Sequence, residues 1–286
     1  MGKASSGRET WLMVVNVIVT IVDLVANVVP FGATSPFDPD GSNGVVKLRV
    51  GGIAAPPAAT FSIWGIIFGW IFVFLFAQFG FCCQLKEDVM KATPSMIVAQ
   101  LAQACYGLGI YLIPDKGVCL LVASVTITAA LAAFLYTAWL IKDYPVRTYF
   151  WLFGYAINAA WLVVATYVQW SSLFVFNGLP MNTLQIPFLL ATVLVICVLS
   201  LAPVFRYPPA FFCVSLWTFT FQALLWAPQP EADENFSEAV QKAYRTIVAV
   251  VAVLSLPGAA YVFYKKLTTD DDYLDVVESQ EDAEQS

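Results

Sequence analysis

Four polar side chains recur on one face of the apolar stretch NVIVTIVDLVAN near the start of the chain. Asn16, Thr20, Asp23 and Asn27 are spaced by four, three and four residues, which places them on one side of an α-helix. Because an ionised Asp facing lipid costs several kcal/mol, this stripe is expected to face protein or a wet cavity. Two interpretations stay open: interhelical hydrogen bonding, worth roughly 0.6–2 kcal/mol per pair, and a functional hydrogen-bonding or protonatable role for Asp23.

Two later apolar stretches also carry polar and aromatic side chains at helical spacing. A large flat aromatic ring that lines a cavity suits a large flat apolar ligand, whereas plain packing between helices is the alternative. Three helices with such stripes suggest one shared interior site. The residues of the two later stripes are Gln100, Gln103, Tyr106, Trp151, Tyr155, Asn158 and Trp161.

Several kinds of chemistry lack their usual residues. The chain contains no histidine, the commonest general base and metal ligand. Its six cysteines show neither a disulfide spacing nor a zinc spacing. There is no phosphate-binding Gly loop, no pair of carboxylates within the apolar stretches and no nucleophile–base pair. We therefore expect a protein that is not an enzyme, requires no cofactor, has no metal site and binds no nucleic acid.

The helices that carry these residues are expected to span a membrane. The chain is 59% hydrophobic and 12% charged, with a mean hydropathy of +0.74, whereas soluble domains are roughly a quarter charged. The apolar residues come in blocks long enough to cross a bilayer as helices. The sequence thus predicts an all-α integral membrane helix bundle of about eight transmembrane helices. The candidate spans are residues 11–32, 60–83, 96–113, 117–141, 148–169, 184–204, 209–227 and 243–264.

Lys and Arg residues favour a cytosolic N-terminus and a cytosolic C-terminus, with nine on that side of the eight spans and five on the other. Three motifs agree with this orientation: a myristoylation pattern at Gly2, palmitoylation candidates at Cys82 and Cys83, and a glycosylation sequon at Asn235. A eukaryotic endomembrane or the plasma membrane is therefore favoured over the mitochondrial outer membrane.

Tandem prolines, Pro56 and Pro57, follow a long polar connection at residues 33–56. Inside a helix, proline removes a backbone hydrogen bond and kinks or breaks the helix, but it suits the first turn. Connections of this length often act as lids. We expect a lid hinged at the two prolines, followed by a helix that brings Phe61 and Trp64 into the bundle.

The two chain ends are expected to lie outside the membrane. Residues 1–10 form a cytosolic N-terminal segment, and the acidic tail at residues 267–286 has too little apolar content to fold. Within the tail, Tyr273–Val276 (YLDV) resembles a tyrosine-based sorting signal read by an adaptor protein. A solubilising acidic tail is the alternative interpretation.

The segment PPAATFSIWGIIFGWIF resembles the Pro-Pro…Phe-x-x-Trp signature of the translocator protein/tryptophan-rich sensory protein (TspO/MBR) family. Gln103 and Tyr106 take the places of that family's third-helix Asn and Trp. Asn158 and Trp161, in INAAW, are similar to its fifth-helix Leu-Asn-x-x-x-Trp. The resemblance covers residues 11–170 and is closest to longer members; residues 171–266 would add three transmembrane helices.

The resemblance implies a five-helix core with an intramembrane pocket beneath the connection between the first two helices. The family binds porphyrins and, in some members, sterols or related lipids, so porphyrin or haem would be a ligand. Asp23 and Asn27 enter the candidate set from the stripe argument alone. The candidate ligand-binding residues are Asp23, Asn27, Phe61, Trp64, Gln103, Tyr106, Trp151, Asn158 and Trp161.

The favoured function is that of a multi-pass membrane protein that binds a large apolar ligand, a tetrapyrrole or a sterol or lipid, as a sensor or carrier. One alternative is a secondary transporter of a small solute, motivated by Asp23. A non-catalytic structural or receptor-like scaffold is the other. The expected partners are membrane lipids, the hydrophobic ligand and a second copy of the chain in a homodimer.

Overall fold

The computed structural model describes residues 7–32, 62–80 and 83–178, together with isolated positions between 210 and 268. The three continuous ranges form helices and contain no strand, and short connections join α4 to α5 and α5 to α6. Five of these helices are long and apolar enough to cross a membrane. The helices are α1 (Gly7–Gly32), α3 (Ile63–Ala77), the short 3-10 helix η2 (Gln78–Gly80), α4 (Cys83–Leu112), α5 (Lys116–Ile141) and α6 (Val146–Phe176).

The predicted all-helical architecture is thus confirmed for the described ranges, and the five helices that are long and apolar enough to cross a membrane correspond to the first five candidate spans. The last three candidate spans fall outside the continuous described ranges, so the total of eight stays a prediction. Ala210 and Val214, two isolated helical positions, are fully buried and belong to the same apolar cluster as α6.

Helix α4 begins at Cys83, well before the predicted start at residue 96. The intervening segment is charged and contains Pro94, features that are more typical of a connection than of a membrane span. Instead, Lys91 pairs with Glu87 and Asp88 one turn earlier, at 3.2 and 3.9 Å. These pairs stabilise a polar helical extension, and the exposed Pro94 lies inside the helix.

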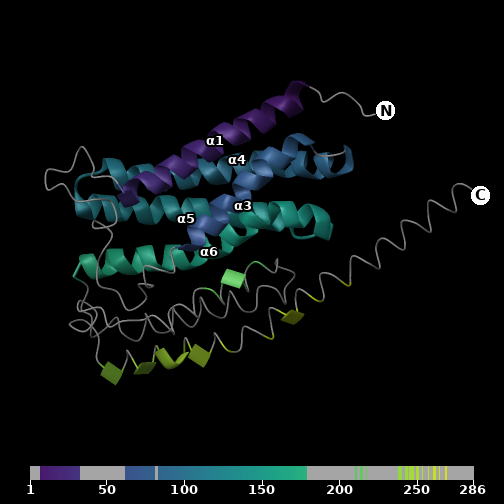
Figure 1. Cartoon of the computed structure of the whole chain (residues 1–286). Coiled ribbons are helices and arrows are strands. Elements are labelled where there is room, and N and C mark those ends of the chain that lie inside the picture. The colour runs from purple at the N-terminus through teal and green to yellow at the C-terminus, as the bar shows by residue number, and fades with distance from the viewer. Residues whose placement is uncertain are drawn as a thin grey trace, which may run out of the picture.

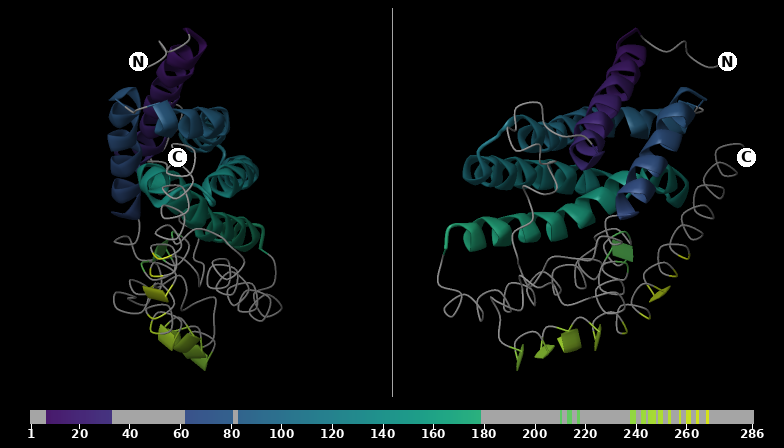
Figure 2. Two further views of the ribbon diagram at one scale, coloured as in Figure 1. Left: turned by 90° about the vertical axis from the view of Figure 1, so that its right-hand side faces the viewer. Right: turned by 60° about the vertical axis from the view of Figure 1, so that its left-hand side comes forward.

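The helices pack as neighbours in a layered bundle. α1 lies on α4, α4 on α5, and α5 on α6, while α3 packs mainly on α6 (Figure 1). Two further views show α1 and α3 at one edge of the bundle (Figure 2). α1 and α3 make little contact with each other, whereas α4 and α6 both reach the interior. The apolar core is formed mainly by residues of α3, α4, α5 and α6, and the polar stripe of α1 is buried against α4.

Two glycines allow helices to approach closely. A Cβ atom added at Gly107 on α4 would lie 2.2 Å from the carbonyl oxygen of Ala26 on α1. A Cβ atom at Gly154 on α6 would lie 2.9 Å from Cγ1 of Ile71 on α3. Small residues at such contacts are typical of membrane helix packing, because backbones gain dispersion contacts only at short range.

Large apolar side chains also cover the outside of the bundle. Such a surface is unstable in water but matches a lipid environment. The interior, in contrast, is filled by fully buried side chains that include Phe74, Phe134 and Tyr155. Exposed large apolar side chains on the five long helices include Ile18, Val25, Val73, Phe76, Val98, Leu101, Val125 and Phe150.

Candidate functional site

The polar stripe on α1 faces protein, as the helical spacing predicted. Asn16 and Asp23 are fully buried, Thr20 is 2% exposed and Asn27 is 6% exposed. The stripe lies against α4, and apolar residues on the opposite side of α1, such as Ile18, are exposed. Burial against another helix satisfies the requirement that polar groups in a membrane find protein partners.

One chain of hydrogen bonds crosses from α1 through α4 to α6. The Thr20 hydroxyl donates to Oε1 of Gln100 at 2.8 Å. The other end of the same amide, Nε2 of Gln100, donates to the Tyr155 hydroxyl at 3.0 Å. All three side chains are buried. These two hydrogen bonds therefore fix the relative positions of α1, α4 and α6 at one level of the bundle.

A second polar group lies one turn further along α1 and α4. Nδ2 of Asn27 donates to Oδ1 of Asp23 at 2.7 Å and approaches the backbone oxygen of Gln103 at 3.5 Å. Nδ2 of Asn158 on α6 donates to Oε1 of Gln103 at 2.7 Å. Asp23, Asn27, Gln103 and Asn158, here called the amide–carboxyl cluster, therefore connect α1, α4 and α6.

Three polar atoms of this cluster have no hydrogen-bond partner among the residues that the structure describes. They are Oδ2 of Asp23, Nε2 of Gln103 and Oδ1 of Asn158, and each belongs to a side chain with 0% exposure. Buried polar atoms are almost always paired, and an unpaired one costs free energy. The amide–carboxyl cluster thus holds hydrogen-bonding capacity that the described protein atoms do not use.

Aromatic rings adjoin the cluster on α6. Trp161, one turn after Asn158, is 1% exposed, and its ring meets that of Trp64 edge to face, with centroids 6.2 Å apart. Trp64 in turn stacks on Phe68 at 5.4 Å. Tyr106, one turn after Gln103 on α4, packs against the same apolar core. Polar and aromatic candidates are therefore contiguous along α4 and α6.

One candidate does not join this arrangement. Trp151 lies seven residues before Asn158, roughly 10 Å along the helix, and its ring contacts Phe150. The sequence analysis gave Tyr155 no ligand-binding role. In the structure, its hydroxyl on α6 accepts the hydrogen bond from Gln100, which in turn accepts one from Thr20. Its position three residues before Asn158, on the same helical face, is the sequence signal for that role.

Other predicted features lie outside the described residues. Cys83 is described only as the first residue of α4. The expectations about a lid, lipidation, glycosylation and sorting therefore stay predictions. The predicted features that lie outside the described residues are the connection 33–56, Pro56, Pro57, Phe61, Gly2, Cys82, Asn235 and Tyr273–Val276.

An apolar groove of about 190 Å³ lies between α1 and α3. Pockets that enclose a drug-sized ligand are about 300–1,000 Å³. The groove is therefore too small to enclose a large ligand, and its lining offers no polar group to orient one. It is lined by Val14, Val17, Ile18, Ile21, Phe72, Leu75, Phe76 and Phe79.

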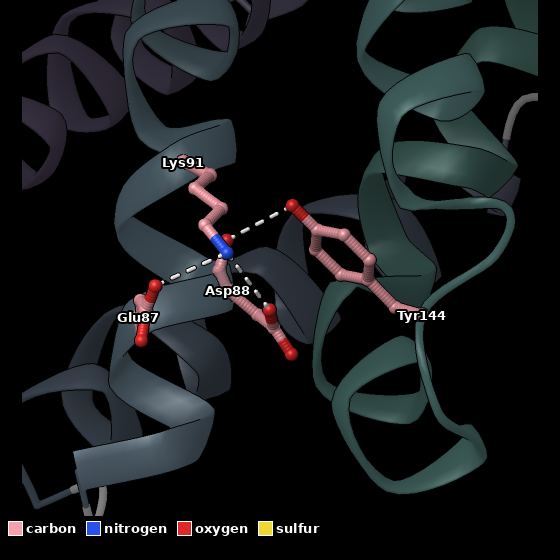
Figure 3. A network of polar contacts seen from close by, with 4 residues as sticks. All are labelled: Glu87, Asp88, Lys91 and Tyr144. Carbon is pink, nitrogen blue, oxygen red and sulfur yellow. Dashed lines mark hydrogen bonds and ion pairs between the residues drawn. The ribbon is translucent and has the colours of Figure 1, made fainter.

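Charged residues gather at the end of the bundle where α4 begins. Lys86 pairs with Glu9 of α1 at 3.2 Å. The Tyr144 hydroxyl, in the α5–α6 connection, donates to the backbone oxygen of Asp88 at 3.0 Å, next to the Lys91 ion pairs (Figure 3). Partial burial, and secondarily the nearby Asp88 carboxylate, raises the pKa of Tyr144 above its ordinary value of 10.0. This network ties helix ends together and is separate from the interior cluster.

The fold and the buried cluster together define a class: a helix bundle with five helices long and apolar enough to cross a membrane and with a polar cluster enclosed between them. Comparison of the chain with protein-family models, with curated proteins and with solved structures gives no match. Among the described residues, no group of three or more His, Cys, Asp or Glu side chains is placed to hold a metal ion.

Proposed function

We propose that the protein binds a large, mostly apolar ligand inside the helix bundle and acts as a sensor or carrier. The observation that carries the proposal is the set of three buried, unpartnered atoms on Asp23, Gln103 and Asn158. Within a membrane, an unsatisfied polar group costs more than in water, because no solvent can take the missing partner's place. A ligand that supplies these hydrogen bonds would recover that cost on binding.

The neighbouring aromatic rings supply the apolar part of the proposed site. Trp64 and Trp161 come from different helices and already contact each other edge to face. Trp64 is only partly buried, so its ring offers surface to a flat ligand. Ligand sites in proteins typically combine such aromatic walls with a few polar groups that fix orientation.

The position of the site along the bundle supports the same proposal. α1 ends at Gly32 and α3 begins at Ile63, so the predicted lid, residues 33–56, joins the helix ends beyond Asn27 and Trp64. The resemblance to the TspO/MBR family favours tetrapyrroles and sterols or related lipids as the ligand. It also favours a pocket beneath this connection.

A titration of the purified full-length protein in lipid nanodiscs would test the proposal. Protoporphyrin IX and a fluorescent sterol, dehydroergosterol, serve as probes, and quenching of Trp fluorescence reports binding. Saturable quenching in the wild type, lost in the double variant Trp64→Ala/Trp161→Ala, supports the proposal. The matched control removes two lipid-facing indoles, Trp11→Ala/Trp139→Ala, and is expected to keep the saturable phase.

Quenching that rises linearly with both probes, or that is equally saturable in the Trp64→Ala/Trp161→Ala variant, contradicts the proposal. Circular dichroism of both double variants verifies that the helices are intact. A variant that loses its helices is replaced by Trp64→Phe/Trp161→Phe, which keeps the ring volume.

Asp23 favours a second candidate function, secondary transport of a small solute. A buried carboxyl with one unpartnered oxygen is a typical coupling group in transporters. Proton-coupled uptake into proteoliposomes that Asp23→Asn abolishes would favour transport over simple binding.

We further propose that the N-terminus faces the cytosol. Among the Lys and Arg residues of the three continuous described ranges, one end of the bundle holds five and the other holds Lys116. Protease protection of N-terminally tagged protein in sealed vesicles tests this orientation. The five are Arg8, Lys86, Lys91, Lys142 and Arg147.

A further inference from the structure

Asp23 has surroundings unlike those of the other acidic residues in the three continuous described ranges. It lies within α1 and is fully buried, whereas the others lie at or near helix ends. The Lys and Arg residues of these ranges also lie near helix ends, and none of them forms an ion pair with Asp23. The other acidic residues are Glu9, Glu87, Asp88, Asp115 and Asp143.

A carboxyl group enclosed in this way has two favourable states. A lone buried charge is costly, so the group either keeps its proton or faces a cation. Oδ1 of Asp23 accepts from Asn27, while Oδ2 has no partner among the described residues. Oδ2 is therefore the atom that carries the proton in one state and faces the cation in the other.

Gln103 and Asn158 add one hydrogen-bond donor and one acceptor to the same cluster. Nδ2 of Asn158 donates to Oε1 of Gln103, which leaves Nε2 of Gln103 and Oδ1 of Asn158 without a partner among the described residues. If both amides are turned by 180°, the shared bond reverses, and the remaining atoms are again one N–H donor and one carbonyl acceptor. An N–H group of a ligand can therefore donate to this pair in either arrangement.

We infer that the polar group of the bound ligand is a basic amine, so that the ligand is a lipophilic amine; this inference rests on the proposed function. When Asp23 carries a proton, the amine nitrogen takes it: the O–H bond at Oδ2 breaks, an N–H bond forms, and an ammonium faces a carboxylate. When Asp23 is ionised, the amine enters as an ammonium and forms the same pair. The final pair has no net charge in either case.

The ammonium suits the cluster better than other polar groups do. Its N–H groups donate to Oδ2 of Asp23 and to the free acceptor of the amide pair, and charge-assisted hydrogen bonds are roughly twice as strong as neutral ones. A hydroxyl forms only neutral bonds with a protonated Asp23 and does not compensate an ionised one. A ligand carboxylate leaves a net negative charge in the cluster, even when a protonated Asp23 donates to it.

The apolar body of the amine would lie along the aromatic rings that adjoin the cluster. Trp161 follows Asn158 by one turn on α6, and its ring contacts that of Trp64 on α3. These rings give the binding energy that any flat apolar body shares. The amine nitrogen at Asp23 then gives the selectivity among ligands with similar bodies.

Three pyrene probes with the same flat body and different ends test the inference: 1-pyrenebutylamine, 1-pyrenebutanol and 1-butylpyrene. Each is titrated into the full-length protein in nanodiscs of phosphatidylcholine, a lipid without net charge. Energy transfer from Trp to pyrene reports binding, and empty nanodiscs correct for partition into lipid. The amine is expected to bind roughly tenfold more tightly than the alcohol, as a charge-assisted hydrogen bond in place of a neutral one would give.

Asp23→Asn tests the source of this preference, because it removes the carboxyl group and keeps an acceptor for Asn27. This variant is expected to bind the amine and the alcohol with similar affinity. Asp143→Asn is the matched control: it changes the net charge equally at an exposed position and should keep the preference for the amine. If Asp23→Asn loses its helical circular dichroism, Asp23→Ser, with a smaller neutral side chain, replaces it.

The possible results separate the inference from the proposed function. Saturable binding in which the alcohol or 1-butylpyrene equals or exceeds the amine overturns the inference and leaves ligand binding intact. A preference for the amine that survives in Asp23→Asn also overturns it, because the preference then arises elsewhere. Absence of saturable transfer for every probe contradicts the proposed function itself.

Discussion

The backbone of Gly107 on α4 lies against that of Ala26 on α1, so that an added Cβ atom would be 2.2 Å from the Ala26 carbonyl oxygen. The contact lies next to the amide–carboxyl cluster on both helices. On α1, Ala26 lies between Asp23 and Asn27, and on α4, Gln103 precedes Gly107 by one turn. The closeness of α1 and α4 here brings the Asn27 amide within 3.5 Å of the Gln103 backbone oxygen.

Replacing Gly107→Ala should push α1 away from α4, because the neighbouring atom is backbone and cannot rotate aside. We expect a loss of about 1–3 kcal/mol in the free energy of unfolding and weaker ligand binding. Thermal unfolding in detergent, followed by circular dichroism, measures the first effect. Gly65→Ala is the control, since its Cβ would meet nothing within 4 Å. Equal stability of both variants would show that the α1–α4 contact is not tight.

Tyr155→Phe removes the acceptor of the Gln100 amide and should leave a buried donor unpartnered. We expect the free energy of unfolding to fall by about 1 kcal/mol. Denaturant titration in mixed micelles measures the change. Tyr136→Phe removes the hydroxyl of an exposed tyrosine and is expected to have no effect. A double variant with Gln100→Met should lose little more than Tyr155→Phe alone, and full additivity would argue against direct coupling.

Asp23→Asn keeps an acceptor for the Asn27 amide but removes the ionisable group. Stability should change by less than about 1 kcal/mol. The affinity for protoporphyrin IX, whose polar groups are carboxylates, should rise, because the new amide adds N–H donors from which a carboxylate can accept hydrogen bonds. Asp143→Asn changes the net charge equally at an exposed position and should leave that affinity unaltered. No gain in affinity for protoporphyrin IX would mean that the ligand's polar group lies away from Asp23.

Tyr144→Phe tests the network at the other end of the bundle. At neutral pH, loss of the hydrogen bond to Asp88 should lower the free energy of unfolding by about 1 kcal/mol. Because the folded pKa of Tyr144 is raised above 10.0, the unfolded chain loses this proton first, and the stabilisation declines as the pH rises past that value. Unfolding free energies of wild type and variant should therefore converge at alkaline pH. A constant difference would exclude titration of Tyr144 as the cause.

Much of the local architecture could be predicted from the sequence, because a bilayer imposes simple rules on length and polarity. The first five apolar stretches are helices, and the stripe from Asn16 to Asn27 faces protein. The start of α4 could not be predicted, because the ion pairs of Lys91 with Glu87 and Asp88 continue the helix through a charged segment that resembles a connection.

The sequence by itself determined which faces of each helix are polar, since helical periodicity depends only on spacing. Only the tertiary structure decided which faces meet: Gln103 pairs with Asn158 and Thr20 with Gln100, whereas Trp151 lies apart from them. The physical reason is that partner choice depends on where backbones can approach, as at Gly107 and Gly154. That distance arises from the packing of whole helices and is not encoded in any one of them.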